Sequence, residues 1–201
     1  MSARTITIVE TGLANLASVQ AAWLRLGHQP KVTTDAIEVR DADLVMLPGV
    51  GAFGPGMAVL GQYGLDEALQ ERAQAGRPIL AVCLGLQLLA ERSDEAGHAT
   101  GLGILPASVQ RLEGPDRVPH MGWAPILPTP TARLLSPGYA YFAHSYAIRG
   151  LPEGHAGATS QHSGRSFVAA VEHGAVLAMQ FHPELSGALG EALLARWAQE
   201  T

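Results

Sequence analysis

The feature that most constrains the fold of this chain is the alternation of short apolar runs with amphipathic stretches through its first half. The runs have the length of buried strands, whereas the stretches between them repeat their apolar residues with a helical period. Strands that alternate with helices in this way pair in parallel and are covered by helices on both faces. The expected strands are residues 5–9, 30–34, 43–48 and 78–83. The expected helices are residues 15–27, 64–76 and 84–92, and a broken segment is expected from Pro55.

The second half of the chain is richer in Gly and Pro and contains several β-prone segments, which predict antiparallel strands and hairpins added to the parallel core. These segments are residues 107–112, 139–148, 166–172 and 175–181, followed by an expected helix at 187–200. No internal repeat or linker interrupts the sequence. We therefore expect one α/β domain over residues 1–201, built on an open, mostly parallel sheet flanked by helices, with added antiparallel strands in the C-terminal half.

Composition sets the broad class of protein. The 201 residues are 47% hydrophobic and 15% charged, which is enough apolar surface for one sizeable core. A net charge of −5 gives no reason to expect a nucleic-acid or membrane partner. No stretch approaches about 18 uninterrupted apolar residues, and the N-terminus lacks the shape of a signal peptide. A single cysteine cannot form an internal disulfide and suits a reducing compartment, so we expect a cytoplasmic protein.

The only cysteine, Cys83, ends an expected strand at the point where the chain must turn at once into a helix. A residue at such a turn projects its side chain above the sheet. The backbone N–H groups and the dipole of the following helix favour an anion there, and the thiolate is the form of cysteine that attacks. The N–H of Leu84 is placed to stabilise an oxyanion on a bound carbonyl. The alternative is that Cys83 is only a small buried apolar residue.

A base for this nucleophile is offered by His182, which ends an apolar strand and precedes a proline. Because side chains at i and i+2 of an extended chain lie on the same side, Glu184 is expected to reach back to His182 and fix its tautomer. Cys83, His182 and Glu184 then match the logic of nucleophile, base and orienting carboxylate. The alternative is a surface His-Pro turn with a solvated Glu184.

A glycine-rich stretch at residues 49–54 fits G-x-G-x-x-G, so dinucleotide binding has to be considered. The stretch does not open the first βα unit, further Gly and Pro residues follow it, and the chain has no G-K-[ST]. Glycines at a strand end near Cys83 instead suit an N–H donor to an oxyanion hole. Eight histidines form neither H-E-x-x-H nor a Cys-His cluster, so we expect neither a metal nor a cofactor.

Taken together, residues 78–88 ("PILAVCLGLQL") and "FHPE" resemble the class I, triad-type glutamine amidotransferases. Three further stretches, "LPGVGAF", "PHMGW" and "YFAHSYA", resemble the glutaminase subunits of imidazole glycerol phosphate synthase, and "TGLANLASV" is similar to that family's opening loop. The matches run from residue 10 to residue 187. "PHMGW" followed by "HSY" is the more specific signal, whereas the cysteine turn and "HPE" mark only the broader class.

The resemblance implies hydrolysis of glutamine to glutamate and ammonia through a γ-glutamyl thioester on Cys83, with His182 as general base and acid and Glu184 as orienter. It implies that the N–H groups of Leu84 and of Val50 or Gly51 form the oxyanion hole. The residues that would contact glutamine are Gln87, His144, Ser145 and Tyr146, and those that would face the synthase partner are Met121 and Trp123. For Trp123 the alternative is an ordinary core aromatic.

The family resemblance also implies where the ammonia goes. In this family it passes to a (βα)8-barrel cyclase subunit, which makes imidazole glycerol phosphate and an aminoimidazole carboxamide ribotide in histidine biosynthesis. A barrel of about 200 or more residues does not fit in this chain, so we expect the cyclase to be a separate polypeptide and the complex a heterodimer. Glutaminase activity is expected to stay low until the cyclase and its ligand are present, because the peptide at 49–51 has to turn to complete the oxyanion hole.

The sequence departs from the family pattern in the opening loop at residues 10–15, which includes Thr11, and at Ala81, Ala124 and Leu185. The nearest alternative function is a class I glutaminase of anthranilate, guanylate or pyridoxal phosphate synthesis. A cysteine hydrolase or peptidase is an alternative from another enzyme class, and a metabolite-binding or scaffold domain is the non-enzymatic one.

Overall fold

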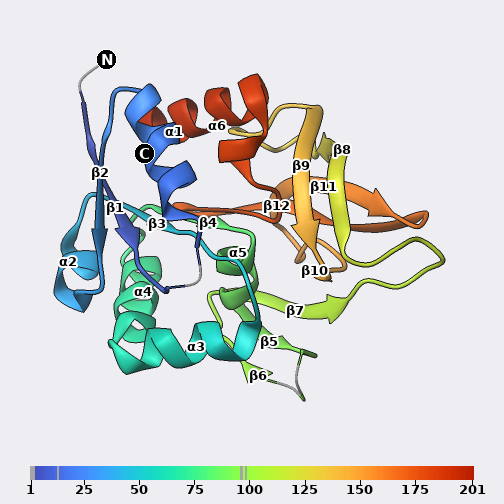
Figure 1. Ribbon diagram of the computed structural model, residues 1–201, viewed down its shortest axis with the longest axis horizontal. Helices are drawn as coiled ribbons and strands as arrows, with labels where there is room; N and C mark the ends of the chain where they lie inside the picture. The colour runs from blue at the N-terminus through green and yellow to red at the C-terminus, as the bar shows by residue number, and fades with distance from the viewer. Residues whose placement is uncertain (1–2, 13, 96, 98) are drawn as a thin grey trace.

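The apolar runs of the first half form the parallel part of a nine-stranded sheet in the computed structural model, which describes residues 3–12, 14–95, 97 and 99–201 (Figure 1). The parallel strands are β1 (Thr5–Val9), β2 (Gln29–Thr33), β3 (Leu44–Leu47), β4 (Ile79–Val82) and β13 (Val176–Met179). Their spatial order is β2-β1-β3-β4-β13. All four predicted strands of the first half are thus present, and their C-terminal ends meet at one edge of the sheet.

The same sheet continues through antiparallel strands from the second half, as the sequence predicts. Beyond β13 its order is β12-β11-β8-β9. These strands are β8 (His120–Pro128), β9 (Gly138–His144), β11 (Ala156–His162) and β12 (Arg165–His173). Strand β13 joins the two parts, because it pairs in parallel with β4 and antiparallel with β12. The strands β8 and β11 were not expected from the sequence.

A second, four-stranded sheet was also not expected, and one of its strands takes the place of the end of a predicted helix. Its order is β10 (Tyr146–Ile148), β7 (Leu105–Arg111), β5 (Ala90–Ser93) and β6 (Ala99–Thr100). The helix predicted over 84–92 is wrong beyond its first turn: α5 spans only Leu84–Leu88. The N–H groups of Leu102 and Leu105 donate to the carbonyls of Leu88 and Leu89, so pairing with a distant segment replaces the local helical hydrogen bonds.

Helices cover both faces of the large sheet. Helices α1 (Leu16–Arg25) and α6 (Gly187–Glu200) lie on one face, and α3 (Phe53–Gln62) and α4 (Leu65–Gln74) lie on the other (Figure 1). Trp23 and Trp197 of the first pair pack together with ring centroids 5.9 Å apart. The expectation of a broken segment after Pro55 is wrong, since Pro55 lies in the first turn of α3, where its missing N–H has no helical acceptor.

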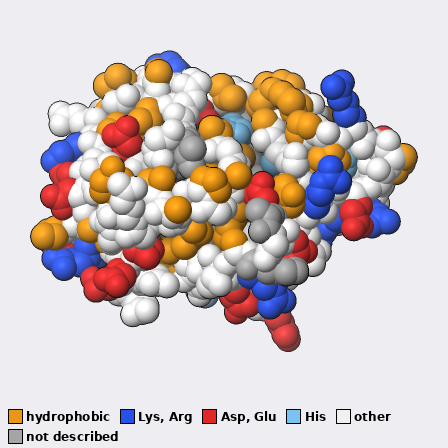
Figure 2. All heavy atoms as spheres, turned by 60° about the horizontal axis from the view of Figure 1, so that its bottom comes forward, with side chains coloured by type: hydrophobic (Ala, Val, Ile, Leu, Met, Phe, Trp, Pro, Cys, Tyr) orange, Lys and Arg blue, Asp and Glu red, His pale blue; other side chains and the backbone are white. Residues whose placement is uncertain are grey.

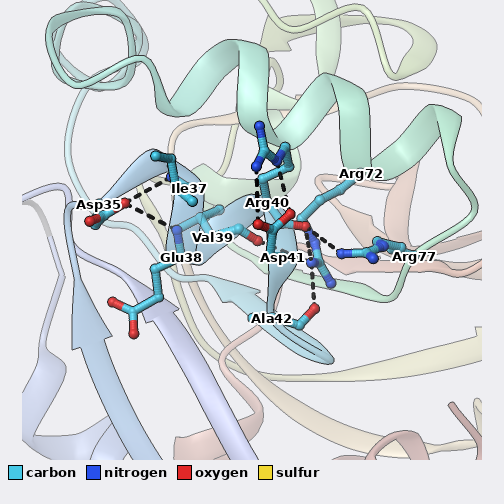
Figure 3. A network of polar contacts seen from close by, with 9 residues as sticks. All are labelled: Asp35, Ile37, Glu38, Val39, Arg40, Asp41, Ala42, Arg72 and Arg77. Atoms are coloured by element: carbon cyan, nitrogen blue, oxygen red, sulfur yellow. Dashed lines mark hydrogen bonds and ion pairs between the residues drawn. The ribbon is translucent and has the colours of Figure 1, made fainter.

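A buried arginine holds the remaining helix, α2 (Ala36–Asp41), in place (Figure 3). The guanidinium of Arg72 on α4 donates to the carbonyls of Val39, Ala42 and Pro78 at 3.0, 2.6 and 2.9 Å. Burial lowers the pKa of Arg72 to about 10, so it remains charged at neutral pH. These bonds join α2, α4 and the residue that precedes β4, the strand that leads to Cys83.

Candidate functional site

Cys83 occupies a sharp turn between β4 and α5. Its φ of 54° is in the left-handed region, which a non-glycine residue adopts at a cost of about 1–3 kcal/mol. The backbone N–H of Cys83 donates to the carbonyl of Met179 at 2.8 Å, so the turn stays attached to β13. Gly85 permits the turn, because a Cβ there would lie 2.0 Å from the carbonyl oxygen of Leu47. Such strain in a well-supported turn is typical of a functional residue.

The sulfur of Cys83 is largely buried and has polar neighbours. The side-chain amide of Gln180 donates to Sγ at 3.6 Å, and the carbonyl oxygen of Ala143 lies 3.9 Å from Sγ. The thiol also interacts with His182. An inert buried cysteine packs among apolar groups alone, so these neighbours favour a chemical role for Cys83.

His182 and Glu184 are in contact, although for a different reason from the one predicted. Nδ1 of His182 donates to Oε1 of Glu184 at 2.9 Å, and both side chains are buried. The expectation that an extended chain would bring them together is wrong, because residues Pro183–Leu185 form a short 3₁₀ helix, η1. This turn packs tightly on α6: a Cβ on Gly190 would lie 1.9 Å from the carbonyl oxygen of Pro183.

The electrostatics of His182 favour its charged form. Burial alone would lower the pKa of His182, but hydrogen bonds and charge from Cys83 and Glu184 outweigh burial and raise it to about 10. At neutral pH the imidazole therefore carries a proton that it can give to a leaving group. Nδ1 is directed to Glu184, which leaves Nε2 for proton exchange at the sulfur and the substrate.

A cavity of about 210 Å³ opens beside the sulfur. All eight residues of the predicted nucleophile and substrate or oxyanion sets line it: Val50, Gly51, Cys83, Leu84, Gln87, His144, Ser145 and Tyr146. His182 and Glu184 line an adjoining hollow that shares Val50 and Ala143 with this cavity. Segments more than 100 residues apart in sequence thus meet at the C-terminal edge of the parallel strands, where open α/β sheets bind their ligands.

The cavity wall also includes Glu95, which the sequence did not predict. It follows β5 and is the only acidic residue among the described residues that line the cavity, and its Oε2 accepts from the backbone N–H of Phe53 at 2.7 Å. No local sequence pattern marks Glu95, because its position depends on the second sheet that was not foreseen. A carboxylate at this place gives the cavity an attraction for a cationic group.

The predicted oxyanion hole is not assembled in this structure. The N–H of Leu84 donates to the carbonyl oxygen of Gly49 at 3.1 Å, so that donor is occupied. In this arrangement the N–H of Leu84 does not face a bound oxyanion. The carbonyl of Gly49 has to move away before the N–H of Leu84 can face the cavity. The nearby Gly51 has a φ of 105°, which glycine adopts easily.

His144 and Tyr146, which are expected to contact glutamine, are hydrogen-bonded to each other. Nδ1 of His144 donates to the carbonyl oxygen of Tyr146 at 2.9 Å, and burial lowers the pKa of His144 to about 3. This neutral tautomer leaves Nε2 as an acceptor, so the His144 side chain cannot donate to a substrate carboxylate. The carbonyl oxygen of Tyr146 is therefore already hydrogen-bonded within the protein, although Tyr146 lines the cavity.

Met121 and Trp123 lie on β8 with exposed fractions of 64% and 56%, so Trp123 is not a core residue. Ala124, one of the departures from the family pattern, is buried, whereas Leu185 is exposed on η1.

Within the described residues, no three His, Cys, Asp or Glu side chains gather as a metal site would require. None of the helices in that part of the chain is long and apolar enough to cross a membrane.

Comparison with known proteins identifies the class. The family described as glutamine amidotransferase class-I matches residues 8–199. A solved glutamine amidotransferase, 22% identical, has a TM-score of 0.76 with 96% of this chain and 97% of that chain covered. The glutaminase domain of CTPS from Trypanosoma brucei, 16% identical, has a TM-score of 0.64 over 99% of this chain and 94% of that chain. The chain belongs to the class I glutamine amidotransferases, and the predicted fold class is confirmed.

Curated relatives narrow the family further. Over 199 residues the chain is 43% identical to the imidazole glycerol phosphate synthase subunit HisH of Oceanobacillus iheyensis, with 96% of this chain and 98% of the relative covered. Over 201 residues it is 39% identical to the HisH subunit of Lactococcus lactis, with 98% and 99% covered. Within its class, the chain is a member of the HisH family.

Proposed function

We propose that this chain is the glutaminase subunit of an imidazole glycerol phosphate synthase, acting in histidine biosynthesis. The observation that carries the proposal is the meeting of Cys83, His182 and Glu184 beside a cavity, in a chain about 40% identical to HisH subunits along its length. Residues 1–201 act as a single glutamine amidotransferase domain. The one cysteine is a free thiol, which suits the reducing cytoplasm.

The chemistry follows from the placement of the three side chains. The thiolate of Cys83 attacks the carboxamide carbon of glutamine and forms a C–S bond. His182 gives a proton to the amide nitrogen as the C–N bond breaks, so that ammonia leaves and a γ-glutamyl thioester remains. His182 then takes a proton from water as the water attacks the thioester, and glutamate leaves with the sulfur restored as thiolate. Glu184 keeps Nδ1 occupied throughout, so that Nε2 exchanges the proton.

The oxyanion formed in each attack needs donors that the peptide between Gly49 and Val50 controls. With the carbonyl of Gly49 on the N–H of Leu84, the isolated chain is expected to have low activity. Binding of a partner that turns this peptide would release one donor and supply a second. Val50 has an exposed fraction of 42%, so a partner can reach it.

An exposed apolar face is the surface we assign to the cyclase partner. Along β8 the outward residues Met121, Trp123, Pro125 and Leu127 are all apolar, and Tyr139 on the neighbouring β9 is 63% exposed. An exposed apolar band of this kind, on the last two strands of the sheet, is typical of a protein interface. Figure 2 shows hydrophobic side chains over the middle of one face, with most charged side chains toward its rim.

Release of glutamate from glutamine tests the proposed function. The purified chain is expected to be slow alone and to become about tenfold faster or more when a (βα)8-barrel cyclase is added together with its ribotide ligand, which is the scale of ordinary coupling between sites. The synthase component of an anthranilate synthase serves as the partner control. Stimulation by that component, or cleavage of peptides or esters in preference to glutamine, would overturn the assignment.

Glu95 is the residue we assign to the α-ammonium group of glutamine, because it is the acidic group at the cavity wall. Glu95→Gln keeps the size and an oxygen acceptor for the N–H of Phe53 but removes the charge. We expect the KM for glutamine to rise about 10- to 100-fold, the usual worth of a hydrogen bond to a charged group, with a smaller change in kcat. Glu91→Gln, on the exposed surface of β5, is the control. An unchanged KM for Glu95→Gln would remove Glu95 from the site.

A further inference from the structure

Gln180 is a fully buried amide that lies directly beside the sulfur of Cys83. It follows the last residue of β13, and the register of β13 and β4 pairs Met179 with Val82. Gln180 and Cys83 therefore succeed paired residues on neighbouring parallel strands. Nε2 of Gln180 donates to Sγ at 3.6 Å, within the range of a hydrogen bond to sulfur. Neither the triad nor the glutamine-binding set described above includes this residue.

The orientation of the Gln180 amide is determined by a chain of hydrogen bonds that ends on the backbone. Nε2 of Gln87 donates to the carbonyl of Tyr146 at 2.9 Å and to Oε1 of Gln180 at 3.1 Å. Because a backbone carbonyl can only accept, the nitrogen of Gln87 must face Tyr146. A flipped Gln87 would place its oxygen against two acceptors. With Oε1 of Gln180 thus held toward Gln87, its Nε2 is the end that faces Sγ.

We propose that Gln180 is a further catalytic residue, whose side-chain amide holds and stabilises the Cys83 thiolate; this inference rests on the proposed glutaminase function. A donor to sulfur favours the thiolate over the thiol, since a hydrogen bond to the charged form is the stronger one. The same donor assists the second half of the reaction. When water attacks the thioester, the C–S bond breaks with its electron pair passing to sulfur, and Gln180 stabilises the departing thiolate.

The proposal also assigns Gln87 a second role, beyond contact with glutamine. Both hydrogens of its Nε2 are used within the protein, so only its Oε1 is left for a ligand, as an acceptor. Gln87 therefore positions Gln180 and does not donate to the substrate. Gln87 at the cavity wall holds Gln180, and Gln180 contacts the sulfur of Cys83. A substitution of Gln87 would therefore also disturb the contact at the sulfur.

Alkylation of the single cysteine tests the role of Gln180 without glutamine. Cys83 is the only cysteine in the chain, so the rate of iodoacetamide labelling reports on one thiol. For Gln180→Met, which removes the donor at similar length, we expect the labelling rate at pH 6.5 to fall about 10- to 100-fold and to approach the wild-type rate at high pH. The kcat for glutamine with the cyclase present should fall similarly, with little change in KM. Leu177→Met, a buried change on the same strand, should alter neither rate.

A merely structural role for Gln180 predicts a different result. It would lower the thermal unfolding midpoint while leaving the pH dependence of labelling unchanged, and that outcome in folded protein overturns the proposal. Gln180→Glu retains the size of the side chain and serves where Gln180→Met does not fold; its carboxylate should slow labelling at pH 6.5 further. The two proposals can fail separately. If the wild-type chain released no glutamate with the cyclase present but the Gln180 variants were still labelled slowly, the contact of Gln180 with the sulfur would stand and only the proposed glutaminase function would be overturned.

Discussion

Replacement of Cys83 by alanine is expected to lower glutamate release with the cyclase present by about 10⁴-fold or more, because no other group can form the thioester. The fold should survive, since the side chain lost is small and the turn keeps its backbone bond to Met179. The measurement is steady-state glutamate production, with the thermal unfolding midpoint recorded for the same sample. Residual activity within tenfold of wild type would show that Cys83 is not the nucleophile and is only a small buried residue.

Glu184→Gln is the matched comparison for this loss. The amide keeps the shape of the carboxylate and can still accept from Nδ1 of His182, but it no longer stabilises the imidazolium. We expect a loss that is about 10- to 100-fold smaller than that of Cys83→Ala, because an orienting group assists a step that the nucleophile makes possible. Equal losses would mean that Glu184 does more than orient His182.

The parts of the fold that were predicted correctly are those in which a local pattern agrees with its tertiary setting. Strands β1, β3 and β4 are short apolar runs that are almost entirely buried, so their length and composition indicate strands. The helix predicted over 84–92 fails after Leu88, because Ala90 and the residues after it pair with β7 and β6. Nothing within that segment signals a partner 15 residues further along the chain.

The site shows the same division between local and distant information. Cys83 and His182 were found because each ends an apolar strand, a position that the sequence itself displays. Glu95 depends on the second sheet, and the bond from Leu84 to the carbonyl of Gly49 joins two loops, so no local pattern predicts either. Gln180 did leave a signal that was not used: a glutamine beside a buried strand requires polar partners, and those partners are Gln87 and the sulfur.

Replacement of Gly85 by alanine is expected to lower both stability and activity strongly, although it adds only one methyl group. The new Cβ would lie 2.0 Å from the carbonyl oxygen of Leu47, which is backbone in a paired strand and cannot rotate away. The turn at Cys83 must then shift, and it carries the N–H of Leu84 with it. We expect the variant to lose about 3 kcal/mol or more of unfolding free energy and about 100-fold or more of its activity, the scale of a lost oxyanion donor.

Gly54→Ala is the control that separates this contact from the general effect of replacing glycine. Gly54 lies in the first turn of α3, and a Cβ there meets nothing within 4 Å. Alanine in a helix is favoured over glycine by about 0.5–1 kcal/mol, so this variant should be as stable as wild type or slightly more stable, with its activity unchanged. Denaturant unfolding and glutamate release of the two variants are measured side by side. If Gly85→Ala behaved like Gly54→Ala, the close approach of Gly85 to Leu47 would not be what shapes the turn. The nucleophile would then owe its position to the pairing of β4 with β3 and β13 alone.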